Sequence, residues 1–437
     1  MGIGQGGAAG TAGVSVEAAA GVSADAAAAE PQVPAGGPAR RLGRLGPLLL
    51  TGHVAWALPS AASGTLIQAL LEDQRPGSKV ASYAVLTAVG AVAAVTSTVV
   101  AGALSDRTRS RFGRRNPWIL GGAAVSSAGL ALTGLTGVFA LQVLFFAVYQ
   151  AGLNAMLSSL HALLPDRVAA GSLGRASALG GIGYLVGTAL GGAAASAAIE
   201  TPGVGLRLVP WTMVAAGLLL FLLARDTSSA GLQRERWDAA ALLRSLRPPD
   251  DPDFRWAFAG RFCVISALFV LAFYQLYLFT DLLGLDRDRA GELIAVGNAL
   301  LGAGALLASG AGGVLSDRLG RRKPLVVAAS ALVGLAALPA MTTVTVPTVM
   351  AFYVVGGLGF GAFLSVDQAL MVEVLPGSGS EARDLGFLSI ANTTPVVLGP
   401  VIAAGLVTVL GYRSLFAATF VLALTGALCV LRIRRVR

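Results

Sequence analysis

The sequence predicts an all-α membrane protein of about twelve transmembrane helices, arranged as two six-helix pseudo-repeats. Three observations predict this class. Hydrophobic residues make up 55% of the 437 residues and charged residues only 13%, whereas a soluble domain carries about 25% charged residues. Long apolar runs recur along the chain, and a basic signature occurs twice, half a protein apart. Most of the chain therefore cannot face water.

The apolar runs are each about 20 residues long, enough for a helix to cross a hydrocarbon core of roughly 30 Å. They are too long, and too rich in Ala and Leu, for barrel strands of roughly 9–11 residues. Proline in a first helical turn, as at Pro117 and Pro324, is typical of helix starts. Glycines four apart, such as Gly183 and Gly187, predict close helix packing. We predict spans at roughly 46–70, 80–104, 117–136, 138–164, 176–199, 206–224, 256–283, 290–315, 324–343, 347–373, 385–408 and 411–431.

The duplicated signature joins an acid to a cluster of arginines at the mouth of an apolar segment. Its first copy lies in residues 102–117 and its second in residues 313–324. Asp106 and Asp317 are 211 residues apart, and two Leu-Pro pairs further along the chain have the same offset. Two marks at one spacing indicate two homologous halves. This layout is typical of membrane transporters built from repeats.

The net charge of +9 follows from membrane topology. If both termini lie on one side, only six of the 32 Lys and Arg residues fall in loops on the opposite side. This asymmetry follows the positive-inside rule and places both termini in the cytoplasm. It accounts for the basic excess without a nucleic-acid partner, and we expect none. The six opposite residues are Arg75, Lys79, Arg207, Arg287, Arg289 and Arg413.

The composition divides the chain into five parts. Residues 1–44 are rich in Gly and Ala, lack a helical period and are expected to form a disordered cytoplasmic tail. Residues 45–224 and 256–431 are the two six-helix halves, and residues 225–255, with prolines and alternating charges, are the cytoplasmic linker between them. Residues 432–437 form a short basic cytoplasmic tail.

No pattern in the sequence indicates a cofactor, a metal site or an enzyme. Cys263 and Cys429 both fall inside predicted spans, so neither a disulfide framework nor a metal site is indicated. The chain lacks the GxxxxGK[ST] phosphate loop, so it does not hydrolyse nucleotide by that route. No HExxH or GxSxG motif lies in a span.

Twelve spans, a 6+6 repeat and a basic signature after the second and eighth spans together resemble the major facilitator superfamily. The resemblance covers nearly all of residues 45–431 and implies the major facilitator fold. Residues 313–322 fit the superfamily's loop signature, Gly-x-Leu-x-Asp-Arg-x-Gly-Arg-Arg, almost residue for residue. The first copy departs from it, because the five residues from Thr108 to Phe112 separate Arg107 from Gly113.

The longer first copy, residues 105–118, resembles that of the glycoside-pentoside-hexuronide:cation symporter branch and the related sucrose transporters. Three further strings, at 253–258, 366–370 and 384–392, point the same way. Sodium-coupled members of that branch place acids within spans two and four. Span two holds none here, and span four none before Asp166. We therefore expect proton coupling or uniport rather than coupling to a sodium ion.

The resemblance also implies that the duplicated signature is a latch. In the family, acid–arginine pairs at cytoplasmic helix ends hold the cytoplasmic side shut while the outside is open, through charge-assisted bonds. The alternative is a loop that only sets topology. The expected pairs are Asp106 with Arg107 or Arg114, and Asp317 with Arg318 or Arg321.

One acid lies well inside a span. Asp367 is about six residues from the cytoplasmic end of the tenth span, and Glu373 lies at the margin of that span. A charge in the hydrocarbon is costly and usually faces the bundle interior or water. We expect Asp367 to be the coupling residue, which takes the proton or a polar group of the substrate. The alternative is a structural bond to a neighbouring helix.

Other polar residues at membrane depth are candidates for substrate binding. Sugars are commonly held by amide and carboxylate hydrogen bonds together with an aromatic platform. For each candidate the alternative is a bond between helices. His53 also lies at this depth, and we expect His161 to be a helix-end residue rather than a proton carrier. The substrate-binding candidates are Trp56, Asn154, Gln275, Asn298 and Asn392.

These observations predict a monomeric secondary transporter of the plasma or inner membrane, whose two halves rock about a central site. The leading expectation is uptake of a sugar or glycoside-like solute with a proton. Proton-driven export of a small amphipathic compound is the alternative, and a transport-dead receptor or scaffold is the alternative of another class. The expected partners are a small-molecule substrate, a proton and the lipid bilayer.

Overall fold

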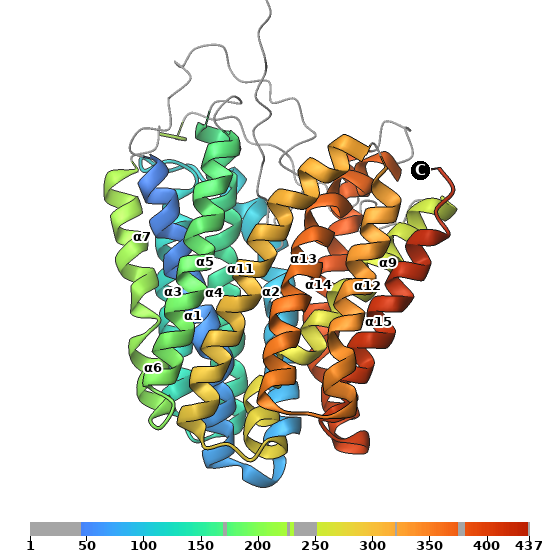
Figure 1. Cartoon of the computed structure of the whole chain (residues 1–437). Helices are drawn as coiled ribbons and strands as arrows, with labels where there is room; N and C mark the ends of the chain where they lie inside the picture. Colours follow the sequence, from blue (N-terminus) through green and yellow to red (C-terminus); the bar gives the residue numbers. More distant parts are fainter. Residues whose placement is uncertain are drawn as a thin grey trace, which may run out of the picture.

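The computed structural model describes residues 45–168, 173–224, 228–230, 251–319, 321–374 and 381–435, which form a bundle of long helices (Figure 1). Eleven helices in these residues are long and apolar enough to cross a membrane, and a shorter apolar stretch, Leu398–Leu410, completes another. The all-α membrane fold predicted from the sequence is confirmed. The predicted tail, residues 1–44, and most of the predicted linker lie outside the described residues.

Each half contributes six membrane-crossing elements, of which one in each half is broken. In the first half they are α1 (Leu45–Gln74), α2 (Lys79–Arg107), α3 (Asn116–Leu135), α4 (Phe139–Arg167), α5 (Leu173–Ala197), and α6 (Pro202–Leu208) with α7 (Trp211–Leu223). In the second half they are α9 (Pro252–Ala272) with α10 (Gln275–Tyr277) and the π turn η4 (Leu278–Leu282), α11 (Arg287–Leu319), α12 (Arg322–Thr342), α13 (Val346–Val374), α14 (Glu381–Leu410) and α15 (Arg413–Leu431).

The spans predicted at roughly 206–224 and 256–283 are present, but each is interrupted. The first is divided between α6 and α7 at Pro210, because proline lacks the N–H that the helix ladder needs. The second stops at Ala272 and continues as α10 and η4. Hydropathy does not register such breaks, because the residues on either side of them are equally apolar.

The second half was predicted to begin at residue 256, after the linker. The α9 helix begins at Pro252, because the carboxylate of Asp251 accepts the backbone N–H groups of Asp253 and Phe254 at 2.9 and 3.1 Å. Such a cap satisfies helix-end donors that would otherwise lack partners. Asp253 in turn accepts the backbone N–H groups of Arg434 and Arg435 at 3.0 and 2.8 Å, which holds the end of the described chain against the start of α9.

The helix contacts repeat between the halves. The second helix packs on the fourth in both, as α2 on α4 and as α11 on α13, and the third packs on the fourth, as α3 on α4 and as α12 on α13. Between halves, α11 packs on α5 and α2 packs on α14. Each of these interfaces joins the second span of one half to the fifth of the other, as expected for two related halves that face each other.

Glycines allow the closest of these approaches. A Cβ on Gly183 of α5 would lie 2.5 Å from the carbonyl oxygen of Leu50, and one on Gly187 would lie 2.7 Å from that of Val54. In the second half, a Cβ on Gly357 of α13 would lie 2.5 Å from the Leu301 carbonyl oxygen. The small-residue packing predicted for α5 is confirmed, because no side chain larger than hydrogen fits at these contacts.

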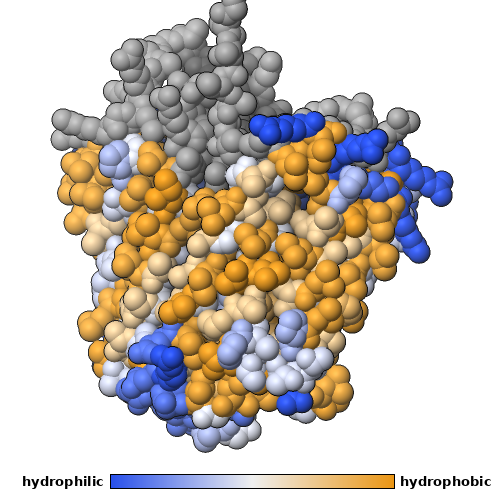
Figure 2. All heavy atoms as spheres, in the orientation of Figure 1, coloured by the Kyte–Doolittle hydropathy of each residue, from blue (hydrophilic) through white to orange (hydrophobic). Residues whose placement is uncertain are grey.

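The apolar surface forms a belt around the middle of the bundle. Figure 2 shows hydrophobic residues over most of the visible face, with hydrophilic residues gathered towards the two ends. Large apolar side chains are exposed within the belt, for instance Leu307 at 71% and Leu428 at 61%. A soluble protein rarely exposes an apolar patch of more than a few hundred Å². The belt is the surface that lipid covers.

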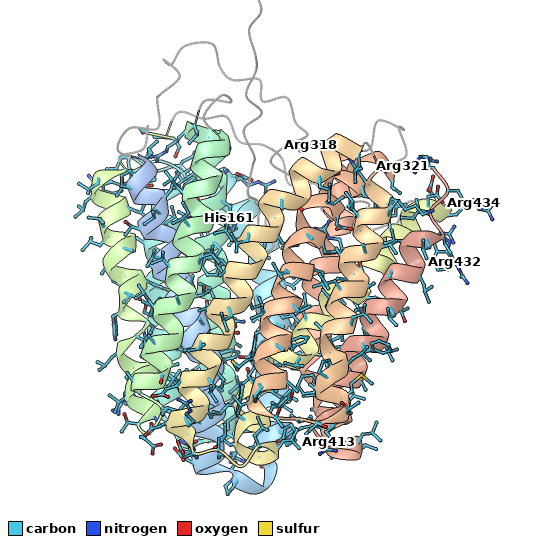
Figure 3. The ribbon with its side chains drawn as sticks, viewed as in Figure 1. His161, Arg318, Arg321, Arg413, Arg432 and Arg434 are labelled. Atoms are coloured by element: carbon cyan, nitrogen blue, oxygen red, sulfur yellow. The ribbon has the colours of Figure 1, made fainter. Side chains whose placement is uncertain are left out.

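The bundle has two unlike ends. The terminal end, upper in Figure 1, is where α1 begins and α15 ends. The distal end is opposite, and there the 3-10 turn Pro76–Ser78 joins α1 to α2. Figure 3 places Arg318, Arg321, Arg432 and Arg434 at the terminal end, and Arg413 at the distal end.

Candidate functional site

The carboxylate of Asp367 is fully buried in the second half, beside an arginine. Asp367 lies in α13 and is 0% exposed, and Arg261 of α9 is 8% exposed. Arg261 Nη1 lies 3.0 Å from Asp367 Oδ2. Neither carboxylate oxygen accepts a hydrogen bond of good geometry from the described residues, so the contact is one of charge with charge. Among the described residues, the cation of Arg261 is the group that balances this buried charge.

The acid of this pair was predicted from the sequence, but its base was not. Arg261 is the tenth residue of α9 and is buried. The distance from the capping residue Asp251 is the signal that could have found it. At about 1.5 Å per residue, ten residues of helix carry Arg261 about 15 Å into the bundle.

Three of the five substrate-binding candidates have polar groups that are bonded to neighbours. Gln275 of α10 and Asn298 of α11 form a reciprocal amide pair, with N···O distances of 3.3 and 3.2 Å. Asn154 of α4 donates to the Gln150 carbonyl oxygen at 2.8 Å and accepts from the Thr98 hydroxyl at 3.2 Å. Gln275 and Asn298 are therefore brought together, and Asn154 lies apart from them in the first half.

The two remaining candidates differ. Trp56 of α1 is 6% exposed, and its indole N–H is buried without a hydrogen-bond partner among the described residues. Asn392 belongs to α14, but its side chain lies outside the described part of the structure. Among the four candidates with described side chains, Trp56 is the one whose hydrogen-bonding group is left for another molecule or another conformation to satisfy.

The first copy of the duplicated signature forms an ion-pair cluster that includes a pair not named in the sequence prediction. Asp106 pairs with Arg115 at 2.5 Å rather than with Arg114. Arg114 and Arg115 both reach Asp166 at the end of α4, at 2.5 and 3.0 Å. All these residues belong to the first half. The chain turns between them at Gly113, whose φ of 85° favours glycine.

The second copy is only partly described. Arg318 is exposed at the end of α11, and Arg321 is exposed just before α12. The side chain of Asp317 lies outside the described residues. The pairs predicted for Asp317 with Arg318 or Arg321 stay predictions.

We expect Asp106→Asn to slow transport by tenfold or more while the protein still inserts and folds. The Asp106 side chain is 52% exposed, and the loss of an exposed ion pair costs only about 0–1 kcal/mol of stability. If the pair forms in only one transport state, its loss should change the transport rate without changing the stability of the protein. Asp288→Asn, at an exposed acid near the distal end, is the control. Equal transport rates for both variants and the wild type would reduce the signature to a topology signal.

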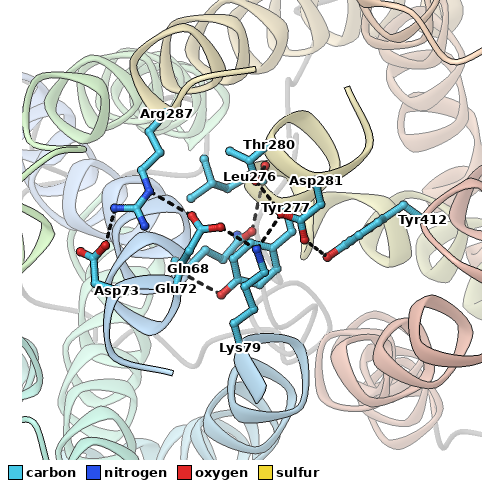
Figure 4. Close-up of polar contacts among 10 residues, drawn as sticks. All are labelled: Gln68, Glu72, Asp73, Lys79, Leu276, Tyr277, Thr280, Asp281, Arg287 and Tyr412. Carbon is cyan, nitrogen blue, oxygen red and sulfur yellow. Dashed lines mark hydrogen bonds and ion pairs between the residues drawn. The ribbon is translucent and has the colours of Figure 1, made fainter. Parts of the chain in front are cut away.

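A second ion-pair cluster, at the distal end, joins the two halves (Figure 4). We call its five charged residues the distal network. Arg287 of α11 contacts Glu72 and Asp73 at the end of α1, at 3.0 and 2.5 Å. Lys79 of α2 contacts Glu72 at 2.5 Å and Asp281 of η4 at 2.6 Å. Four of the side chains are 14–29% exposed, so water screens them only partly.

Neutral groups extend the distal network inward. Gln68 of α1 accepts the Leu276 backbone N–H at 3.2 Å with its side chain and the Tyr277 hydroxyl at 2.9 Å with its carbonyl oxygen. Tyr412 donates its hydroxyl to Asp281 at 2.7 Å. Burial raises the pKa of Tyr412, and the bond to Asp281 raises it further, so the phenol stays a donor at neutral pH.

Contacts between the halves extend from the middle of the bundle to this distal end. Along the α5–α11 interface, a Cβ on Gly302 would lie 3.2 Å from Leu185, one on Gly192 3.2 Å from Ala295, and one on Gly291 3.3 Å from Ser196. Where both partners are described residues, every ion pair between the halves belongs to the distal network. The pairs described at the terminal end stay within one half.

The distal network was not predicted from the sequence. Lys79 and Arg287 were counted only among the basic residues of the opposite loops, where charges are expected in any membrane protein. The signal that could have revealed the network is that acidic and basic residues occur together at this side of the membrane. Acids at the end of the first span and around the seventh span lie among the few basic residues of the opposite loops.

Comparison with known proteins agrees with this architecture. Residues 48–311 and 289–437 match the family model of the Major Facilitator Superfamily. No curated protein matches the chain. A bacterial homolog of the human lysosomal transporter Spinster, in an inward-facing and occupied conformation, is similar with a TM-score of 0.66 and 15% identity, over 90% of this chain and 95% of that one. The nucleoside transporter NupG, in a mutant form, is similar with a TM-score of 0.65 and 14% identity, over 88% and 98% of the two chains.

Proposed function

The chain belongs to the Major Facilitator Superfamily, and from that premise we propose that it takes up a sugar or glycoside-like solute together with a proton, by alternating access. In such a mechanism two half-bundles rock about a fixed central site. The site is then open to one side of the membrane at a time. The halves described above, with their repeated contacts and their interfaces between second and fifth spans, are the bodies that move.

The observation that carries the proposal is the distal network. It supplies the ion pairs between the halves that the described residues form, and it lies at one end of the bundle. With both termini in the cytoplasm, that end faces outward. The network then closes the outer side, and it has to open for solute to enter from outside. Ion pairs suit this role, because they form and break between rigid bodies without repacking a core.

The buried pair of Arg261 and Asp367 supports coupling to a proton. Protonation of Asp367 removes the charge that holds Arg261, so proton binding and a change in the α9–α13 contact are linked. The pair lies nearer the terminal end than the distal network, seven residues before the end of α13. While the distal network closes the outer side, the terminal end is the open side. A proton taken up from outside by Asp367 and released inside would thus change contacts at the terminal end.

Reconstitution into proteoliposomes tests the proposal. Radiolabelled methyl β-D-glucopyranoside, sucrose and uridine are offered with a pH gradient that is alkaline inside. We expect at least one to accumulate above its external concentration, and the accumulation to vanish when the gradient is collapsed. Extrusion of the amphipathic cation tetraphenylphosphonium, with no accumulation of a neutral solute, would favour the export alternative. Saturable binding without flux in either direction would favour the receptor alternative.

The topology has its own test. Gly77 is exposed at the distal end, and a Cβ there meets nothing within 4 Å, whereas Arg109 is exposed at the terminal end. In intact cells we expect an impermeant maleimide to label Gly77→Cys and to leave Arg109→Cys unlabelled. Once the cells are lysed, both positions should be labelled. Labelling of Arg109→Cys from outside would invert the topology and with it the direction assigned to the distal network.

A further inference from the structure

Four rings stand in a row inside the first half. The chain has two histidines, and they face each other across two helices, His53 of α1 and His161 of α4, with ring centroids 5.8 Å apart. His53 lies 6.5 Å from the ring of Trp56, and Trp56 lies 5.4 Å from the ring of Tyr184 in α5. We call these four residues the aromatic cluster. The spacings lie within the roughly 4.5–7 Å typical of interacting aromatic rings.

The cluster offers both an acceptor and a donor. His53 Nδ1 lies 2.8 Å from the Leu49 carbonyl oxygen. Because a carbonyl oxygen only accepts, Nδ1 carries the hydrogen, and the neutral ring presents Nε2 as a lone pair. The Trp56 indole N–H is a buried donor with no acceptor among the described residues. A buried donor left without a partner is costly, because it has lost its hydrogen bonds to water, so an acceptor that reaches it is favoured.

Two of the rings are less deeply buried than the other two. His161 and Tyr184 are half-buried, whereas His53 and Trp56 are 8% and 6% exposed. The helices that carry the less buried rings, α4 and α5, make few contacts with each other. The ends of the row, at His161 and Tyr184, are therefore less deeply buried than its middle.

When both histidines are neutral, no side chain of the aromatic cluster carries a full charge. Within the described residues, its side chains form no ion pair and no hydrogen bond with an Asp, Glu, Lys or Arg side chain. The second half differs, because its buried polar centre is the charged pair of Arg261 and Asp367. An organic cation would be attracted to the tryptophan and tyrosine faces. An imidazole, however, is either neutral or positive and offers such a cation no countercharge.

We propose that the aromatic cluster is the substrate-binding site, and that its substrate is an uncharged ring-shaped solute bearing hydroxyl or carbonyl groups. The apolar face of such a ring packs on the aromatic faces, and its polar edge supplies an acceptor to Trp56 and a donor to His53. This inference rests on the proposed transport function and adds a division of labour to it. The first half binds the solute, and the second half binds the proton.

The two histidines make the site directly observable. With histidine-selective ¹⁵N labelling, the protein gives imidazole signals from His53 and His161 alone, and the variant His161→Asn assigns them. Methyl β-D-glucopyranoside, uridine and tetraphenylphosphonium are each titrated into the purified full-length protein. We expect one of the two neutral probes to shift both histidine signals in a saturable way.

A matched pair of tryptophan variants tests the contact. Trp56→Phe keeps a ring and removes the N–H, so we expect affinity for that probe to fall about threefold to tenfold, as for one lost hydrogen bond. Trp211→Phe, at a residue that is 50% exposed in α7, should leave affinity unchanged. Gly180→Ala gives a second perturbation. Its Cβ would lie 3.1 Å from His53 Nε2, whereas Gly64→Ala, with open space around it, is the control.

Three results would overturn the proposal. The first is that neither neutral probe shifts a histidine signal. The second is that only tetraphenylphosphonium shifts these signals. The third is that a neutral probe raises the melting temperature of the protein but leaves both signals in place. Flux of the same probe in proteoliposomes separates this proposal from the transport function. A probe that binds at the cluster but never crosses the membrane refutes transport, whereas a transported probe whose flux ignores Trp56→Phe refutes the site.

Discussion

Asp367→Asn is expected to abolish accumulation of solute against its gradient while solute binding and exchange across the membrane persist. The amide cannot take up and release a proton, so the pH gradient can no longer drive accumulation of the solute. Exchange requires only that the halves rock with solute bound, and the substrate-binding candidates in the first half lie elsewhere. The measurement is uptake in proteoliposomes with and without a pH gradient, beside exchange at equal pH.

Arg261 complicates the single variant and also supplies its control. Removing one partner of a buried ion pair costs about 3–5 kcal/mol, because the other charge is left uncompensated, whereas replacing both is often neutral. We therefore expect Asp367→Asn to lower stability and the double variant Arg261→Met with Asp367→Asn to regain much of it. Coupling should stay absent in both. Accumulation driven by the pH gradient in the stable double variant would remove Asp367 from the coupling role.

A covalent lock across the distal network should stop transport altogether. With Cys263→Ser and Cys429→Ser to remove the native thiols, Glu72→Cys and Arg287→Cys place one thiol in each half, at side chains that now touch. A short bifunctional thiol reagent should join them and reduce flux to less than about a tenth, because rocking of the halves requires this end to open. Cleaving the linker with reductant should restore flux.

The matched control for the lock lies within one half. Glu72→Cys and Lys79→Cys replace residues whose side chains are also in contact, but both belong to the first half. The same reagent should join them without stopping transport. Loss of flux in both pairs would assign the effect to the reagent or to local damage, and full flux in the linked Glu72–Arg287 pair would show that the distal end does not open.

The fold was predictable because its main features follow from local patterns in the sequence. Apolar runs of span length, a signature repeated after 211 residues and the uneven distribution of Lys and Arg require no knowledge of tertiary contacts. The breaks at Pro210 and after Ala272 were not predicted. They depend on backbone hydrogen bonds and packing, which a hydropathy average does not contain.

The candidate site was predictable only where burial makes a residue type unusual. Asp367 stood out because an acid within a span is costly. Its partner Arg261 did not, because an arginine close to a span start is also what membrane topology requires. The distal network and the aromatic cluster depend on residues far apart in the chain, such as Glu72 with Arg287 and His53 with His161. Such pairs cannot be deduced without the helix packing.

The docking of residues 434 and 435 onto the first turn of α9 has a practical consequence for measuring motion. Asp253 holds two backbone N–H groups there, and Arg435 also pairs with Asp251 at 2.7 Å. A fluorophore placed beside Arg435 is thereby attached to the rigid body of the second half at three points. Energy transfer from a donor on the first half would report rotation of one body against the other, with little contribution from a swinging tether.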